Sequence, residues 1–290
     1  TVNEIAEVVE AASRSEVIIA VVGGSSARDF KTSYQETGAA IADEKSISDM
    51  ECGEGFDRAT LTLLGKQQDL LNALKATGKP LIVVYIEGRP LDKVWASEYA
   101  DALLTASYPG QEGGYAIADV LFGDYNPAGR LPVSVPRSVG QIPVYYNKKA
   151  PCNHDYVEQA ASPLYTFGYG LSYTTFEYSD LQVMRKSPCY FEVSFKVKNT
   201  GSYDGEEVAQ LYLRDEYASV VQPLRQLKCF ERFFLKRGEE KEIFFTLTEK
   251  DLSIIDRNMK RVVETGDFRI MIGASSDDIR LTKDISVESL

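Results

Sequence analysis

The sequence predicts an α/β fold, in which a mostly parallel α/β sandwich domain is followed by an all-β sandwich of the fibronectin or immunoglobulin type. Two observations predict it. Apolar runs typical of buried strands alternate with amphipathic helical segments in the first half, whereas apolar and polar residues alternate with a period of two after about Phe176. We expect three parts. The α/β sandwich domain occupies 1–140, an ordered connection rich in tyrosine and proline occupies 141–176, and the β-sandwich occupies 177–290.

The first half has the pattern of parallel strand–helix units. The run 17–22 is apolar throughout, which is typical of a strand buried on both faces. Leucines at helical spacing give 65–76 one apolar face, and Gly78-Lys79-Pro80 is a strong stop signal. In chain order we expect a helix at 5–12, a strand at 17–22, a helix at 65–76, a strand at 81–86, a short strand at 102–106 and a helix at 113–121.

The connection at 141–176 is expected to wrap over a surface. Its prolines interrupt helices, and its tyrosines bury too much area to be left in water. Beyond it, the aromatic residues follow mainly the inward-facing pattern, and Asn199-Thr-Gly201 supplies a turn. We expect strands at 191–198, 208–213, 229–235, 241–247 and 267–272.

Composition excludes several classes of protein. Of 290 residues, 44% are hydrophobic and 26% charged, so the chain can bury real cores. A net charge of −11 repels phosphate backbones and anionic lipid, and the apolar runs are far shorter than the roughly 20 residues of a membrane span. We therefore expect neither nucleic acid nor membrane as a partner. The chain starts without methionine, directly on a helix, and we expect a segment of a longer protein.

Cysteine and histidine usage favours neither a metal site nor a histidine-based catalytic site. Cys52, Cys152, Cys189 and Cys229 form no C-x-x-C pair, although their disulfide state stays open. The single histidine, His154, has no G-x-S-x-G element to accompany it. The glycines at 23–24 match no phosphate-binding motif. We expect no metal and no cofactor.

The long excursion at 23–58 is the candidate site, because loops after parallel strands carry the sites of open α/β sheets. Within Cys52-Gly-Glu-Gly-Phe56, glycines on both sides of Glu54 allow close approach of a ligand. A desolvated carboxyl there has a raised pKa and donates a proton near neutral pH. The alternative is an exposed turn whose glutamate has no role. For Asp57 and Arg58 we expect a structural role.

Three longer runs resemble signatures of glycoside hydrolase family 3, the family of β-glucosidases and β-xylosidases. They are G-D-Y-N-P-A-G-R-L-P-V-S-V-P (123–136), I-P-V-Y-Y-N (142–147) and P-L-Y-T-F-G-Y-G-L-S-Y-T-T-F (163–176). E-G-F-D-R with L-L-G-K-Q-Q-D-L-L resembles that family's α/β sandwich domain, and F-F-L-K-R-G-E-E-K-E-I-F-F-T-L (233–247) is similar to its fibronectin-like domain. The resemblance covers nearly the whole chain in the correct order.

The resemblance implies a retaining, exo-acting β-glycosidase that hydrolyses terminal non-reducing sugars of oligosaccharides or aryl glycosides. In that family an aspartate of an N-terminal (β/α)8 barrel is the nucleophile, and a glutamate of the second domain is the general acid/base in many members. C-G-E-G-F-D-R falls where those members carry S-G-E-G-Y-D-R, so this role passes to Glu54, with Cys52 in place of serine. The resemblance also implies a periplasmic or secreted protein, and we expect the isolated chain to be inactive because the barrel is missing.

The residues leave two other readings open. The chain is alternatively a non-catalytic carbohydrate-binding or structural module of a larger secreted protein, or a non-catalytic homologue that has lost its partner carboxylate. We expect the β half to act as a structural buttress. The aromatic pairs Trp95/Tyr99 and Tyr145/Tyr146 are candidates for stacking on sugar rings, although buried packing is the more common use of each. Arg28 and Asp29 are further candidates for contacts to sugar hydroxyls. Other substrate-binding residues, and the choice between glucose and xylose, are unknown from the sequence.

Overall fold

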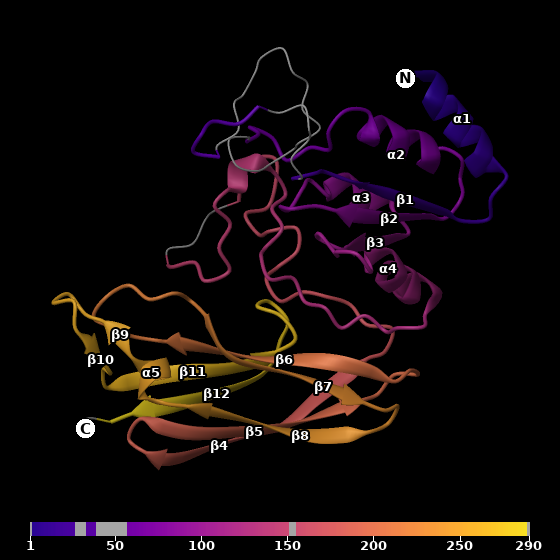
Figure 1. Cartoon of the computed structure of the whole chain (residues 1–290). Coiled ribbons are helices and arrows are strands. Elements are labelled where there is room, and N and C mark those ends of the chain that lie inside the picture. The colour runs from indigo at the N-terminus through magenta and orange to yellow at the C-terminus, as the bar shows by residue number, and fades with distance from the viewer. Residues whose placement is uncertain (1, 27–32, 39–56, 151–154, 289–290) are drawn as a thin grey trace. The chain divides into compact units, whose positions relative to one another are not determined.

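The computed structural model describes residues 2–26, 33–38, 57–150 and 155–288 (Figure 1). The chain divides into two units, which are described separately. Unit 1 comprises Thr1–Asp119 and Pro136–Ile142, and unit 2 comprises Val120–Val135 and Pro143–Leu290. Each unit has its own hydrophobic core. The domain boundaries expected at 140 and 176 stay a prediction.

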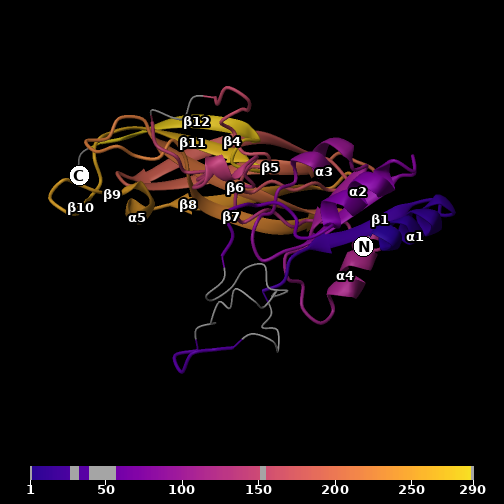
Figure 2. The same cartoon turned by 90° about the horizontal axis from the view of Figure 1, so that it is seen from above.

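Unit 1 contains a parallel sheet in the order β1-β2-β3 among the described residues. Figure 2 shows α2 and α3 on the same side of this sheet. The elements expected from the sequence are present in the expected order, and α3 is an addition. Their bounds are α1 (Val2–Ser13), β1 (Ile18–Gly23), α2 (Gln67–Lys75), β2 (Leu81–Ile86), α3 (Val94–Tyr99), β3 (Ala102–Thr105) and α4 (Gly113–Phe122), followed by a short 3-10 helix at Val139–Gln141.

The core of unit 1 lies on one face of β1. Alternate residues of this strand, from Ile18 to Val22, are buried with Leu71 and Leu74 of α2. On its other face, Ile19 is 44% and Val21 61% exposed. The expectation that this strand is buried on both sides is therefore wrong. β1 is an edge strand of the described sheet, and only one of its faces is covered.

Unit 2 is an antiparallel sandwich of two sheets, in the orders β4-β5-β8 and β12-β11-β6-β7. This confirms the predicted fold class. The first sheet contains β4 (Phe176–Ser187), β5 (Tyr190–Asn199) and β8 (Glu240–Leu247); the second contains β6 (Gly205–Asp215), β7 (Gln226–Leu235), β11 (Gly266–Gly273) and β12 (Ile279–Val287). The short elements α5 (Glu249–Leu252), β9 (Ile254–Ile255) and β10 (Arg261–Val262) lie between β8 and β11.

Side chains from both sheets interdigitate in the core of unit 2. Phe195 of β5 and Leu211 of β6 are fully buried there, as the period of two predicts. Several aromatic residues depart from the inward pattern; among them, Phe230 is 67%, Phe234 53% and Phe244 65% exposed. The outer surface of the sandwich therefore carries large apolar side chains.

The turn after β5 is organised by the side chain of Asn199, which is fully buried. Its Oδ1 accepts hydrogen bonds from Thr174 Oγ1 at 2.7 Å and from Gly201 N at 3.2 Å. Its Nδ2 donates to Tyr203 O at 2.8 Å and to Leu235 O at 3.2 Å. One amide thus satisfies four groups from three segments of the chain, which fixes this end of the sandwich.

Candidate functional site

The carboxyl ends of β1, β2 and β3 lie at one edge of unit 1, because the three strands are parallel and in register. Open α/β sheets bind ligands at this edge. The expected acid/base Glu54 lies outside the described residues, and so do Arg28 and Asp29. The described residues show how the two ends of the 23–58 excursion are held at the sheet.

The excursion leaves the sheet at Gly23, where the side chain of Gln67 acts as a strand partner. Gly23 N donates to Gln67 Oε1 at 2.7 Å, and Gln67 Nε2 donates to Gly23 O at 2.9 Å. Gly23 has φ +144°, and a Cβ there would lie 1.8 Å from Ile86 O, so only glycine fits. The next amide, of Gly24, donates to the same carbonyl oxygen at 3.0 Å. The departure point is therefore fixed.

The excursion returns at Asp57, which binds the loop after β2. Asp57 Oδ1 lies 2.8 Å from Arg89 Nη1 and accepts a hydrogen bond from Arg58 N at 2.7 Å. Hydrogen bonding from the Arg89 guanidinium, with a further contribution from the Arg58 amide, lowers the pKa of Asp57. The Arg58 guanidinium instead reaches Thr60 Oγ1 at 3.3 Å. Asp57 thus ties the excursion to a segment 32 residues further along the chain.

A buried ion pair joins the two ends of the loop that connects β2 to α3. Lys93 Nζ lies 2.6 Å and 2.7 Å from the two carboxylate oxygens of Glu87, and the two residues are only 1% and 5% exposed. Glu87 also accepts a hydrogen bond from Leu91 N at 3.0 Å, and the ammonium lies 4.4 Å from the centroid of the Tyr85 ring. Burial lowers the pKa of Lys93, and the Glu87 carboxylate opposes this shift.

These described charges act as anchors, since each is committed to a partner within unit 1. The pairs hold the end of the excursion and the loop after β2 together. Sequence reasoning missed Gln67, Glu87, Arg89 and Lys93. Three of them follow directly on the strand predicted at 81–86, so the rule that sites lie after parallel strands was the signal available.

The remaining candidates from the sequence are the four cysteines and the single histidine, and the structure describes two of them. Cys52, Cys152 and His154 lie outside the described residues. Cys189 and Cys229 are free thiols, and burial raises the pKa of each, which disfavours the reactive thiolate. Within the described ranges, no three His, Cys, Asp or Glu residues are grouped as metal ligands, and no helix has the length and apolarity of a membrane span.

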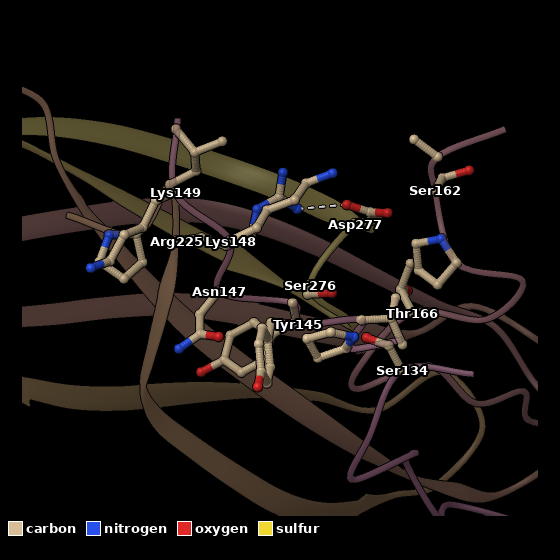
Figure 3. Close-up of a pocket in the computed structure, with 17 residues that line it drawn as sticks. Ser134, Tyr145, Asn147, Lys148, Lys149, Ser162, Thr166, Arg225, Ser276 and Asp277 are labelled. Atoms are coloured by element: carbon tan, nitrogen blue, oxygen red, sulfur yellow. Dashed lines mark hydrogen bonds and ion pairs between the residues drawn. The ribbon is translucent and has the colours of Figure 1, made fainter. Parts of the chain in front are cut away.

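The two aromatic pairs have different surroundings. Trp95 and Tyr99 of α3 contact each other in a tilted arrangement, with ring centroids 5.3 Å apart and an interplanar angle of 37°, and Trp95 packs against the core of unit 1. Tyr145 and Tyr146 instead line a cavity of about 690 Å³ in unit 2 (Figure 3). The second pair therefore borders a cavity, and the first pair contributes to the packing of unit 1.

Two domain families match this chain. Residues 2–173 match the glycosyl hydrolase family 3 C-terminal domain, and residues 207–276 match a fibronectin type III-like domain. Together the matches include unit 1 and most strands of the sandwich.

Curated relatives carry the same region within longer chains. A periplasmic beta-glucosidase of Salmonella typhimurium is 43% identical over 290 residues, which covers 94% of this chain and 35% of the relative. A beta-xylosidase of Formosa agariphila is 41% identical over 283 residues, covering 94% of this chain and 36% of the relative. The chain thus spans about a third of the length of these relatives.

Solved structures of beta-glucosidases share the fold of this chain. The beta-glucosidase from Listeria innocua in complex with glucose superposes with a TM-score of 0.85 at 32% identity, over 100% of this chain and 39% of the other. A beta-glucosidase from Erythrobacter marinus gives a TM-score of 0.85 at 38% identity, over 97% of this chain and 36% of the other. The chain belongs to glycosyl hydrolase family 3, of which it carries the C-terminal domain followed by a fibronectin type III-like domain.

Proposed function

We propose that this chain supplies the general acid/base of a retaining, exo-acting β-glycosidase, a β-glucosidase or β-xylosidase. Its substrates are oligosaccharides or aryl glycosides with a terminal non-reducing sugar. The observation that carries the proposal is the family match over residues 2–173. Relatives named beta-glucosidase and beta-xylosidase share that region over only 35% and 36% of their length, which leaves room for a second catalytic half in a parent chain.

In this mechanism Glu54 protonates the leaving oxygen and then, as a carboxylate, takes a proton from the water that attacks the glycosyl–enzyme. The nucleophile is an aspartate of an N-terminal (β/α)8 barrel, and the two carboxyls need a separation of about 5–5.5 Å. The anchors described above support this role. Glu54 is three residues from Asp57, whose carboxylate is tied to Arg89, and the other end of the excursion is fixed at Gly23.

The proposal is tested in the full-length parent with Glu54→Gln. We expect hydrolysis of p-nitrophenyl glycosides to fall by about 10²–10⁴-fold, the usual contribution of an acid/base group. On an activated aryl glycoside, azide restores turnover and yields a glycosyl azide of retained configuration, because a small anion needs no base to attack the intermediate. Glu36→Gln, at an exposed position in the same excursion, is the matched control and keeps full activity. Absence of azide rescue, or equal losses for both variants, contradicts the assignment.

The isolated chain is proposed to be inactive, because it holds one of the two carboxyls. The measurement is hydrolysis of aryl glucosides and xylosides by the purified chain of 290 residues. Hydrolysis that disappears with Glu54→Gln would show that this chain carries a whole active site.

We also propose that the parent protein is periplasmic or secreted. The Salmonella typhimurium relative is named a periplasmic beta-glucosidase, and this supports the assignment. Fractionation of cells that express the parent is the check, and recovery in the cytoplasm alone contradicts it.

Carbohydrate binding without catalysis is the second candidate, and one surface favours it. A hollow of about 850 Å³ in unit 2 is bordered by five aromatic side chains, each between 41% and 78% exposed: Phe122, Tyr125, Tyr173, Tyr203 and Phe234. Exposed aromatic faces suit stacking on neutral sugars. Depletion of the chain from solution by insoluble xylan or cellulose, lost in Tyr203→Ala with Phe234→Ala, supports this candidate. A parent barrel without a nucleophilic aspartate would make it the principal function.

A further inference from the structure

The cavity beside Tyr145 and Tyr146 is built by several segments of unit 2 that are far apart in sequence (Figure 3). Its volume of about 690 Å³ lies within the usual range for small-molecule sites, about 300–1,000 Å³. Lys148, Lys149 and Arg225 line it from one side, and Ser134, Ser162 and Thr166 are also among its lining residues. We call it the lysine cavity.

Backbone contacts fix the lysine-bearing segment. Lys149 pairs with Pro223 in an isolated antiparallel bridge, and Leu224 N donates to Lys148 O at 2.9 Å. These contacts bring residues 148–149 beside residues 223–225 and place cations from both segments at one cavity. The cationic side of the cavity is therefore a product of the fold.

Aromatic stacking fixes the neighbouring tyrosine. The ring of Tyr146 stacks on Phe167 with centroids 4.2 Å apart and an interplanar angle of 16°. Its hydroxyl accepts a hydrogen bond from Leu227 N at 3.3 Å. Tyr146 thus belongs to the framework, whereas Tyr145 is 66% exposed and presents its ring to solvent at the cavity. An aromatic face next to polar groups is suited to a sugar ring.

The charge of the lysine cavity is opposite to that of the whole chain. The net charge of the chain is −11, yet the cavity is lined by three cations and one anion, Asp277. Asp277 Oδ1 lies 2.7 Å from Arg225 Nη1 and orients that guanidinium. Among the described residues, neither Lys148 nor Lys149 has an ion-pair partner. Two cationic groups are therefore available to an anion, and in an acidic protein they focus anionic ligands on this place.

We propose that the lysine cavity binds a saccharide that carries a carboxylate, of the uronic-acid class. The carboxylate pairs with Lys148 and Lys149, and the sugar ring packs on Tyr145. Hydroxyl and amide groups of the lining, such as Thr166 and Asn147, serve the sugar hydroxyls. Neutral sugars lack a negative charge to pair with the lysines, and simple anions lack a ring to pack on Tyr145. The site therefore prefers a ligand that has both a carboxylate and a sugar ring.

The test is direct binding to the whole chain, so its outcome is independent of hydrolysis by a parent enzyme. The ¹⁵N-labelled chain is titrated with D-glucuronate, D-glucose and acetate at equal ionic strength, and the amide shifts of residues 145–149 and 224–225 are followed. We expect glucuronate to bind at least about tenfold more tightly than the other two, a difference of about 1.4 kcal/mol. Equal binding of acetate would identify an anion site only, equal binding of glucose a neutral-sugar site, and either result, or no binding of glucuronate, overturns the proposal.

Variants separate the site from general electrostatics. Lys148→Glu with Lys149→Glu is expected to weaken glucuronate binding by at least about tenfold, and Tyr145→Ala to weaken glucuronate without creating a preference for acetate. The matched control is Lys260→Glu with Lys283→Glu, which changes the net charge equally at exposed residues that do not line the cavity. Circular dichroism establishes that each variant is folded. If the control weakens binding as much as the cavity pair, the proposal is overturned.

Discussion

Replacing Lys93 with methionine tests whether the buried ion pair supports the loops at the sheet edge. Methionine is also unbranched but carries no ammonium group, so Glu87 keeps the Leu91 amide, 3.0 Å away, without its cationic partner. Removing one partner of a buried pair costs about 3–5 kcal/mol, because the remaining charge is left in a low-dielectric surrounding. With Lys93 1% and Glu87 5% exposed, this range applies without a discount for solvent screening.

The single tryptophan of the chain makes the effect measurable in unit 1 alone. Trp95 packs against the core of unit 1, two residues after Lys93. Its fluorescence in urea therefore follows unit 1, while the amide NMR signals of strands β5 and β6 follow unit 2. A loss of about 4 kcal/mol, at a slope of about 2 kcal/mol per M urea, lowers the fluorescence midpoint by about 2 M.

The control is the same substitution in an exposed pair. Lys75 lies 3.1 Å from Asp101, and their side chains are 35% and 53% exposed, so Lys75→Met is expected to move the midpoint only slightly. The reasoning is refuted if Lys93→Met shifts the Trp95 transition no more than Lys75→Met does. A matching shift in the urea midpoint of the β5 and β6 amide signals would also refute it, because the effect would then not be local to unit 1.

Three further predictions follow from contacts described above. Asn199→Ala leaves four groups unpaired at about 1–3 kcal/mol for each that stays buried, so we expect the urea midpoint of the β5 and β6 amide NMR signals to fall strongly; a fall within error contradicts this. The pKa of Asp57 lies below its ordinary value of 3.8, so the contribution of its pair with Arg89 is complete above 3.8 and is lost as pH falls through the lowered pKa. Carbon NMR of the Asp57 carboxyl should titrate closer to 3.8 in Arg89→Met, and an unchanged midpoint excludes the pair as the cause. Ile19→Thr with Val21→Thr keeps β-branched residues on β1 but removes exposed apolar surface, so we expect light scattering to detect less self-association of the chain. Unchanged scattering would show that the exposed face of β1 does not drive self-association.

The fold was predictable where one local signal dominated. β2 occupies Leu81–Ile86 as expected, because an apolar run follows a Gly-Lys-Pro stop. α3 was not predicted, since six residues are too few for helical periodicity to appear. β4 was not predicted either, because its burial alternates irregularly along Phe176–Ser187 and its pairing with β5 shifts register. The exposed face of β1 could not be deduced from its own residues, because burial depends on which elements cover the sheet.

The sequence predicted where the site lies, but it did not predict which residues contact one another there. The sequence pointed to the loops after the parallel strands, and Asp57 is held at that edge. Its partner Arg89 lies 32 residues away, and such a pairing depends on tertiary structure that local spacing does not encode. The same holds for the lysine cavity, in which residues 148–149 and 223–225 meet across some 75 positions of sequence.

The burial of the Asn199 amide also affects how readily unit 2 is damaged by deamidation. Asparagine side chains deamidate slowly, and the product carries a carboxylate in place of the amide. At this position the new oxygen would face the carbonyl oxygens of Tyr203 and Leu235, so two attractive contacts would become repulsive. The reaction begins when the following backbone nitrogen, that of Thr200, attacks the side-chain carbonyl carbon and ammonia leaves; water then opens the cyclic imide. While the sandwich is closed, Thr200 N donates a hydrogen bond to Thr175 O at 2.9 Å and the Asn199 side chain is fully buried. Chemical damage at Asn199 is therefore expected to mark molecules that have already opened.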